Sequence, residues 1–341
     1  MTPFVLLFVL ACAHRPVPIS LDPVVITGSP ELLDVVGLSN AEIIEAAVDR
    51  RLRGDTQGAI TRLQLVVGQQ PEAAEQADAL YQLGLCHERD ERFDDALAAY
   101  DRLVHAWPDA AVAQDGWFRR ALCLEYLDQH REARRSLAHV QTAEGLDLHD
   151  RLTLDLQRGI TLVRSGRSRA GLQLIESATA AAEGTDLVTY LRGKAHVTRA
   201  RVLLDAARGL ALTGSQKKQE RTLKQRASYL AAAEKEVAAA AYLAEPEWIL
   251  EGLLLLGQAY LDLHQALMSS TPPRKLSDEG KAVYREEVSR YSQVLQIKAW
   301  NHFDAGVSKA GEWRYIGRPL PDLVAARDAI DLGALPSTAS P

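Results

Sequence analysis

The clearest hydrophobic pattern lies in residues 80–108, where apolar and small positions recur at helical spacing in two successive stretches. One face of the first predicted helix carries Leu80, Leu83, Gly84 and His87. One face of the second carries Phe93, Ala96, Tyr100 and Leu103, and Pro108 ends it. The pattern predicts a pair of helices whose small residues allow close approach, while the aromatic residues fill the space beside them.

The same pattern recurs along the chain every 37 residues. Alanines occupy the equivalent position of the second helix in four units: Ala59, Ala96, Ala133 and Ala170. In the fourth unit Arg158 stands where the first helix needs a small residue, with Gly159 beside it. Equal spacings of this kind predict four repeats over residues 41–184, in which Gly84 and the four alanines pack between helices.

The order of large residue, Leu, Gly, aromatic, Ala, aromatic and terminal Pro resembles the tetratricopeptide repeat, whose usual length is about 34 residues. The resemblance implies an all-α, TPR-like α-solenoid of stacked antiparallel helix pairs with a concave face made by the first helices. The family's groove positions fall here on Asp78, Tyr81, Leu85, Glu88, Arg89, Asp115, Phe118, Leu122, Glu125 and Tyr126. The resemblance implies that these residues bind a protein partner. The alternative is that the charges form a solvated face while Tyr81 and Phe118 pack between helices.

The second half of the chain continues the theme with longer helices, predicted at 185–210, 222–244 and 277–310. Gly257 has the spacing of a first-helix packing residue, within the apolar run that follows Pro246. Insertions at 211–221 and 269–276 separate these helices from their neighbours. We therefore expect an irregular, long-helix continuation of the solenoid over 185–312, and a short helix followed by a disordered tail over 313–341.

The N-terminus carries a different signal, an apolar run over residues 4–11 directly before Cys12. The run is too short to span a bilayer, and its sequence Val9-Leu10-Ala11-Cys12 resembles the lipobox of bacterial lipoproteins. That resemblance implies cleavage of residues 1–11, acylation of Cys12 and, because Ala13 follows, sorting to the periplasmic face of the outer membrane. Residues 1–3 lack the usual basic residue, and an ordinary thiol after an apolar run is the alternative. Prolines in 12–40 predict an extended linker between anchor and body.

Composition and motifs limit the kinds of ligand and reaction that the sequence predicts for this protein. The net charge of −6 gives no basic footprint for nucleic acid. The sequence contains no metal-binding histidine pair, phosphate loop or serine elbow, so we expect no metal, no cofactor, no small-molecule substrate and no enzyme activity. A lytic transglycosylase, the enzyme alternative, would need motifs that are missing here. Cys86 and Cys123 are equivalent positions in repeats two and three, which favours two buried thiols over a disulfide.

One basic stretch stands out in this acidic chain, at residues 215–226. Its cations are Lys217, Lys218, Arg221 and Lys224. The simple interpretation is a solvated helix start. The sharper hypothesis is contact with anionic lipid headgroups or with an acidic partner.

A Gly-Gln-Ala-Tyr helix, a Pro-Pro loop and the following "YREE…KAW" resemble repeat lipoproteins of myxobacteria, including a branch in the adventurous gliding-motility apparatus. The function that follows is a non-enzymatic scaffold that binds envelope proteins, with gliding motility as the leading system. The alternatives are an assembly factor for outer-membrane β-barrel proteins and, if Cys12 is not acylated, a cytoplasmic helical-repeat adaptor.

Overall fold

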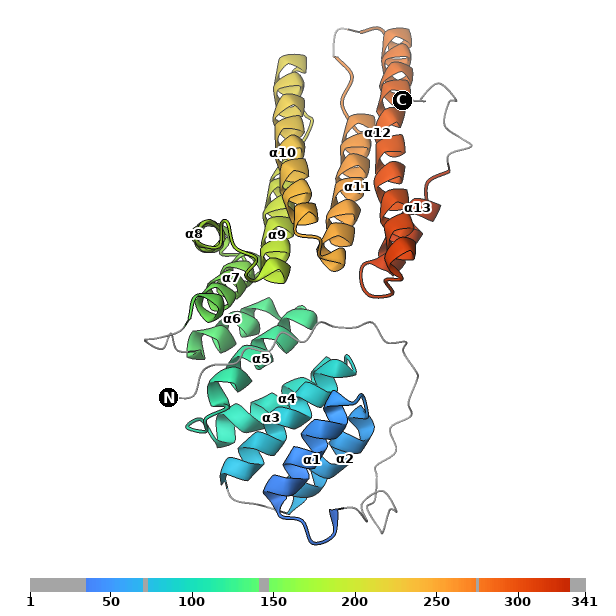
Figure 1. Ribbon diagram of the computed structural model, residues 1–341. Helices are drawn as coiled ribbons and strands as arrows, with labels where there is room; N and C mark the ends of the chain where they lie inside the picture. Colours follow the sequence, from blue (N-terminus) through green and yellow to red (C-terminus); the bar gives the residue numbers. More distant parts are fainter. Residues whose placement is uncertain (1–34, 70–72, 141–146, 274–275, 332–341) are drawn as a thin grey trace. The chain divides into compact units, whose positions relative to one another are not determined.

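The computed structural model describes residues 35–69, 73–140, 147–273 and 276–331 (Figure 1). Within these ranges every regular element is a helix, thirteen in all, and there is no strand. The helices follow one another in stacked pairs, so the expectation of an all-α, solenoid-like fold is confirmed. The predictions for Cys12, for the segment before it and for most of the linker lie outside the described residues.

The chain divides into two compact units. The first contains the described residues up to Arg151 together with Arg164–Arg167; the second contains Leu152–Val163 and the described chain from Ser168. Three helix pairs make up most of the first unit: α1 (Asn40–Leu52) and α2 (Thr56–Gly68), α3 (Ala73–Arg89) and α4 (Phe93–Ala106), α5 (Ala113–Tyr126) and α6 (His130–His139). The predicted linker ends within this unit, because Val35 packs in the same cluster as Ile43 and Ala47.

Helix starts in the first unit follow from capping residues in the sequence. Ser39 and Glu42 form a capping box at the start of α1, in which each side chain bonds to the backbone N–H of the other residue. Asp55 accepts a hydrogen bond from the Gly58 N–H at the start of α2. These caps satisfy N–H groups that have no partner inside a helix, so the sequence itself sets where α1 and α2 begin.

Close packing of a pair depends on Gly84 of α3. A Cβ atom added there would lie 2.4 Å from carbon atoms of the Tyr100 ring on α4. Tyr100 has no exposed surface, and the alanines at 59, 96 and 133 are also completely buried. Glycine is therefore required where the aromatic ring of the second helix meets the first helix.

The fourth pair has a different register from the one that the 37-residue period predicts. It consists of α7 (Leu148–Arg164) and α8 (Ser168–Ala181). Ala170 is exposed, and the buried position is Gly171. A Cβ on Gly171 would lie 2.5 Å from the Gly159 carbonyl oxygen, so the two glycines form the close contact between the helices. Ala170 is thus not a packing residue, because one extra residue shifts the contact to its neighbour.

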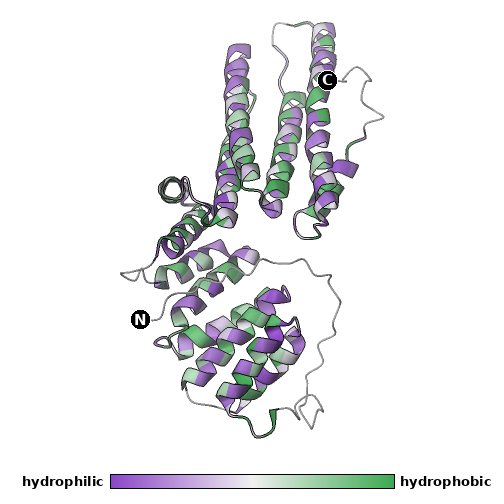
Figure 2. Ribbon diagram, in the orientation of Figure 1, coloured by the Kyte–Doolittle hydropathy of each residue, from purple (hydrophilic) through white to green (hydrophobic). Residues whose placement is uncertain are grey.

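The second unit ends in five further helices: α9 (Thr189–Arg208), α10 (Gln216–Tyr242), α11 (Pro246–Met268), α12 (Asp278–Trp313) and α13 (Leu320–Asp328). Helix α10 begins six residues earlier than expected, since Ser215 caps it by accepting a hydrogen bond from the Lys218 N–H. Figure 2 shows long hydrophilic segments on α10, whereas α11 is largely hydrophobic. No helix in the described ranges combines the length and the apolar character that crossing a membrane requires.

The α11 and α12 helices repeat the packing rule of the first unit. A Cβ on Gly257 would lie 2.2 Å from the Phe303 ring, and Ala299, one turn before Phe303, is completely buried. Ala96 and Tyr100 have the same four-residue spacing on α4. Gly257 therefore packs against an aromatic residue of the next helix, as Gly84 does, although an insertion separates the two helices in the sequence.

Candidate functional site

The predicted groove residues lie on α3 and α5, the first helices of repeats two and three. Their exposure divides them into three groups. Asp78, Arg89 and Tyr126 are exposed, and Phe118 and Glu125 are buried. The half-buried members are Tyr81, Leu85, Glu88, Asp115 and Leu122. Only part of the predicted set can therefore meet a partner directly.

Glu88 is the centre of a polar network between these helices. Its carboxylate accepts hydrogen bonds from the Tyr100 hydroxyl at 2.7 Å and from Arg119 Nη1 at 3.1 Å. The side chains of Arg119 and Glu88 are only 21% and 17% exposed. Burial disfavours the charge of Arg119, but Glu88 and the Tyr100 and Tyr81 hydroxyls outweigh burial and raise its pKa. Glu88 thus fixes α3 to α4 and α5, and its charge is already compensated within the fold.

Two groove predictions are corrected by burial. Phe118 is 5% exposed and Glu125 is 6% exposed, so neither side chain forms an open surface. Tyr126 stacks on Phe93 of α4, with ring centroids 4.2 Å apart and planes within 3°, and it remains 43% exposed. The burial of Phe118 agrees with the alternative interpretation of the sequence, in which this residue packs between helices. Periodicity alone left both interpretations open, because it gives the direction of a side chain but not what lies in that direction.

The first helices also carry two aspartates that are exposed or half-buried, beside the exposed Arg89 and Tyr126. Asp78 of α3 and Asp115 of α5 hold equivalent positions, 37 residues apart. Burial raises the pKa of Asp78. Burial also raises the pKa of Asp115, with Arg119 opposing the shift and Asp150 adding to it. We call Asp78, Asp115 and Asp150 the acidic row. Asp78 is exposed, Asp115 is half-buried and Asp150 is buried, so an approaching cation could reach Asp78 and Asp115 directly.

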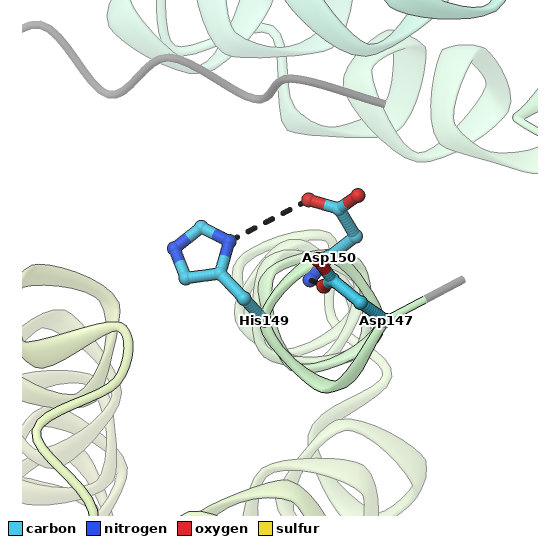
Figure 3. Close-up of side chains that lie close together, drawn as sticks. All are labelled: Asp147, His149 and Asp150. Carbon is cyan, nitrogen blue, oxygen red and sulfur yellow. Dashed lines mark hydrogen bonds and ion pairs between the residues drawn. The ribbon is translucent and has the colours of Figure 1, made fainter. Parts of the chain in front are cut away.

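Asp150 itself was not found from the sequence. It lies at the start of α7, in a small group with Asp147 and His149 whose potential ligand atoms are all within 4.8 Å of one another (Figure 3). Asp147 accepts a hydrogen bond from the Asp150 N–H at 2.8 Å, which is the geometry of a helix cap. His149 Nδ1 lies 3.5 Å from the Asp150 carboxylate. Helix capping by Asp147 thus brings a histidine and two carboxylates together at the start of α7.

The two cysteines are free and buried, as expected from their equivalent positions. Burial raises the pKa of the Cys86 thiol to about 12. Burial and the nearby Glu88 carboxylate also raise the pKa of Cys123, whose sulfur lies 3.9 Å from Glu88 Oε1. Both residues therefore remain protonated thiols at neutral pH and do not provide a nucleophile.

On the corresponding face in the second unit, charged and polar side chains of α9 pair with those of α11. Tyr190 of α9 donates a hydrogen bond to Glu247 of α11 at 2.7 Å. Further along the same helices, Arg201 pairs with Glu251, and Arg208 pairs with Asp262 at 2.6 Å. Charges on this face compensate one another across α9 and α11, which leaves the acidic row of the first unit as the better candidate for recognition.

The predicted basic patch lies on the first turns of α10. Lys217, Lys218, Arg221 and Lys224 are all exposed. Because α10 is already helical at Gln216, residues 217, 221 and 224 share one face of the helix. A continuous exposed face of cations fits both interpretations from the sequence, a solvated helix start and an anion-contacting surface.

Comparison with known proteins agrees with the repeat pattern. Residues 78–110 match the tetratricopeptide repeat family. This segment contains Gly84, Ala96 and Tyr100. Among solved structures, a tetratricopeptide repeat protein from Parabacteroides merdae is similar, with 15% identity and a TM-score of 0.45 over 86% of this chain and 100% of that chain. No curated protein matches the chain.

Proposed function

We propose that this protein is a non-enzymatic scaffold that binds a protein partner through the first helices of its repeats. The observation that carries the proposal is the acidic row, whose carboxylates are held partly desolvated by the fold around α3, α5 and α7. Tetratricopeptide repeats use this side of the solenoid for binding, and residues 78–110 match that family. The row favours a partner segment rich in Lys or Arg.

The proposed location is the periplasmic face of the outer membrane, with the scaffold attached by a lipid on Cys12. The apolar run of residues 4–11 ending at Cys12 and the prolines that follow support this proposal. The partners would then be envelope proteins. A gliding-motility complex is the leading system, on the resemblance of the C-terminal half to myxobacterial repeat lipoproteins. Assembly of outer-membrane β-barrel proteins is the second candidate, and a cytoplasmic adaptor is the third.

The basic patch on α10 adds a proposed contact with anionic headgroups or an acidic partner. Each exposed cation close to an anionic membrane contributes about 1 kcal/mol, so four together are sufficient to orient a tethered body. Replacing Lys217, Lys218, Arg221 and Lys224 with Gln should then reduce binding of the protein to vesicles that contain anionic lipid. Unchanged binding would leave the patch as a solvated helix start.

The test of the scaffold is a crosslinked pull-down from cell envelopes with quantitative mass spectrometry. Four forms are compared: the wild type, Cys12→Ser, the double variant Asp78→Asn/Asp115→Asn, and the control Asp94→Asn/Glu176→Gln. The control removes two exposed carboxylates from second helices, α4 and α8. We expect the acidic-row variant to lose the partner while remaining in the membrane fraction, and the control to keep both.

The outcomes separate the two parts of the proposal. If Cys12→Ser becomes soluble and loses the envelope partners, the lipid anchor is supported. If wild type and Cys12→Ser are both soluble and recover the same cytoplasmic proteins, the adaptor alternative replaces the lipoprotein. If the acidic-row variant and the control bind equally well, partner binding does not use the acidic row.

A further inference from the structure

The first half of α12 extends beyond the helix on which its second half packs. Ser292 is the first buried residue of α12, and its hydroxyl lies 3.5 Å from the sulfur of Met268, the last residue of α11. His264 Nδ1 also lies 3.2 Å from the Ser292 carbonyl oxygen. Since α12 begins at Asp278, about four turns of helix precede the point where α11 ends. On the side of these turns that faces away from Ser292, the described residues include exposed apolar and aromatic side chains.

This outer face is apolar at its ends and charged in its middle. Val283 and Val294 are 59% and 47% exposed, which is high for valine side chains on a packed helix. Glu287 and Arg290 lie between them at helical spacing, so the four residues form one stripe. Tyr291, 70% exposed, borders the stripe, with the Arg290 guanidinium 4.9 Å from its ring centroid.

The stripe is complementary to itself when it is reversed. In an antiparallel pair of α12 helices centred between Val288 and Ser289, Val283 is opposite Val294 of the second copy. In the same register Glu287 is opposite Arg290 of the second copy. Both relations occur twice because a two-fold axis makes each contact reciprocal. Glu287 and Arg290 already pair at 2.5 Å within one helix, so their side chains extend over the same face.

We propose that this stripe binds a second copy of the chain, forming an antiparallel α12–α12 dimer. A parallel pair would place Glu287 against Glu287 and Arg290 against Arg290, which like-charge repulsion disfavours. The antiparallel register instead buries the two valines at each end and pairs four charges in the middle. The proposal does not depend on the lipid anchor or on the acidic row.

The dimer is expected to be weak. The stripe from Val283 to Val294 is about 18 Å long, and its area is well below the roughly 800 Å² per partner of a stable interface. Association should therefore depend on protein concentration, with a dissociation constant of about micromolar or weaker. Attachment of the chain to a membrane would raise its local concentration and favour the dimer.

Sedimentation of the full chain with Cys12→Ser, at increasing concentration, tests the charge pattern. Glu287→Arg alone and Arg290→Glu alone should each weaken association at least tenfold, because each substitution opposes two pairs of like charges. The double variant Glu287→Arg/Arg290→Glu should restore it. Glu312→Arg, a reversal at an exposed position near the other end of α12, serves as the control and should leave association unchanged. Arg290 and Glu312 are exposed and the Glu287 side chain is 46% exposed, so circular dichroism should show the same helix content for every variant.

Disulfide formation between two different variants tests the register. Val283→Cys and Val294→Cys are made separately in the Cys12→Ser background, then mixed under mild oxidation. The antiparallel register predicts a crosslink between the two variants in the mixture and little crosslinking of either variant alone. A monomer at every concentration, a double charge variant that remains dissociated, or preferential Val283→Cys homodimers would each overturn the proposal.

Discussion

A single hydrogen atom in place of a side chain decides how closely α3 and α4 pack. Gly84 leaves room for the Tyr100 ring, and the equivalent contact in the second unit is between Gly257 and Phe303. Gly68, at the end of α2, has no atom within 4 Å of an added Cβ and is exposed. Comparing substitutions at Gly84 and Gly68 therefore separates two effects on stability. A substitution at Gly84 changes both packing and helix propensity, whereas one at Gly68 changes helix propensity alone.

Replacing Gly84 with Ala should destabilise the protein by about 1–3 kcal/mol, because the new methyl group overlaps the buried Tyr100 ring. The gain in helix propensity, up to about 1 kcal/mol, offsets part of this cost. Gly68→Ala should change the free energy of unfolding by no more than about that propensity gain. Denaturant unfolding of both variants measures the difference; equal stabilities would mean that the ring moves aside at no cost.

The Glu88–Arg119 pair permits a second prediction at the scale of single residues. Glu88→Leu should cost about 3 kcal/mol, because it leaves a largely buried guanidinium without its carboxylate. The double variant Glu88→Leu/Arg119→Met should recover a large part of that loss, since no charge remains to be compensated. A double-mutant cycle of the wild type, Glu88→Leu, Arg119→Met and the double variant, measured by chemical denaturation, gives the coupling energy. Additive effects of the two single substitutions would show that the pair contributes no specific interaction.

At the scale of elements, the fourth helix pair shows how one extra residue changes which position packs. The 37-residue spacing of alanines predicts that Ala170 packs between the helices, but the contact between α7 and α8 is made by Gly159 and Gly171. Arg158 could not serve as the small first-helix residue, and the helix turns so that Gly159 does. Each contact of this pair is therefore displaced by one position from the period of the first three pairs.

Gly171→Ala and Ala170→Leu distinguish the two registers. The alanine at 171 would overlap the Gly159 carbonyl oxygen and the Val163 backbone nitrogen, which cannot rotate away as a side chain could. We expect a loss of about 2 kcal/mol or more for Gly171→Ala. Ala170→Leu, on the exposed side of α8, should stay within about 0.5 kcal/mol of wild type. Thermal unfolding of the two variants measures this difference in stability. If Ala170→Leu were the more destabilising substitution, Ala170 would be the packing residue, as the 37-residue period predicts.

At the scale of the molecule, packing between helices is local along the chain. The core is divided into clusters, among them one centred on α1 and α2, one on α3 and α4, and one that contains α9 to α13. Repeat arrays of this kind transmit a perturbation mainly to the neighbouring repeats. The two units should consequently respond separately to damage in either one.

Hydrogen exchange of the Gly84→Ala variant checks this separation. Exchange of backbone amides in α3 and α4 should increase, because the destabilised pair opens more often. Amides in α11 and α12 should exchange as in the wild type. A uniform increase over both units would instead show that the chain unfolds as one cooperative body.

The sequence by itself determined the class of fold, the repeat and much of its packing. Periodic apolar positions identify helices, and a glycine or alanine recurring opposite an aromatic residue identifies their contacts, because both follow from side-chain size and local geometry. Ser39 and Asp55 set the starts of α1 and α2 in the same local way. These features need no knowledge of distant parts of the chain.

Only the tertiary structure decided which first-helix residues are available to a partner. Phe118 and Glu125 have surface-like positions in the repeat yet are buried, while Glu88 is committed to Arg119. Asp150 joins the acidic row from a separate helix, and the start of α12 extends past α11 because α11 ends at Met268. Exposure depends on what the neighbouring helices cover, and that depends on the lengths and stacking of elements far apart in the sequence.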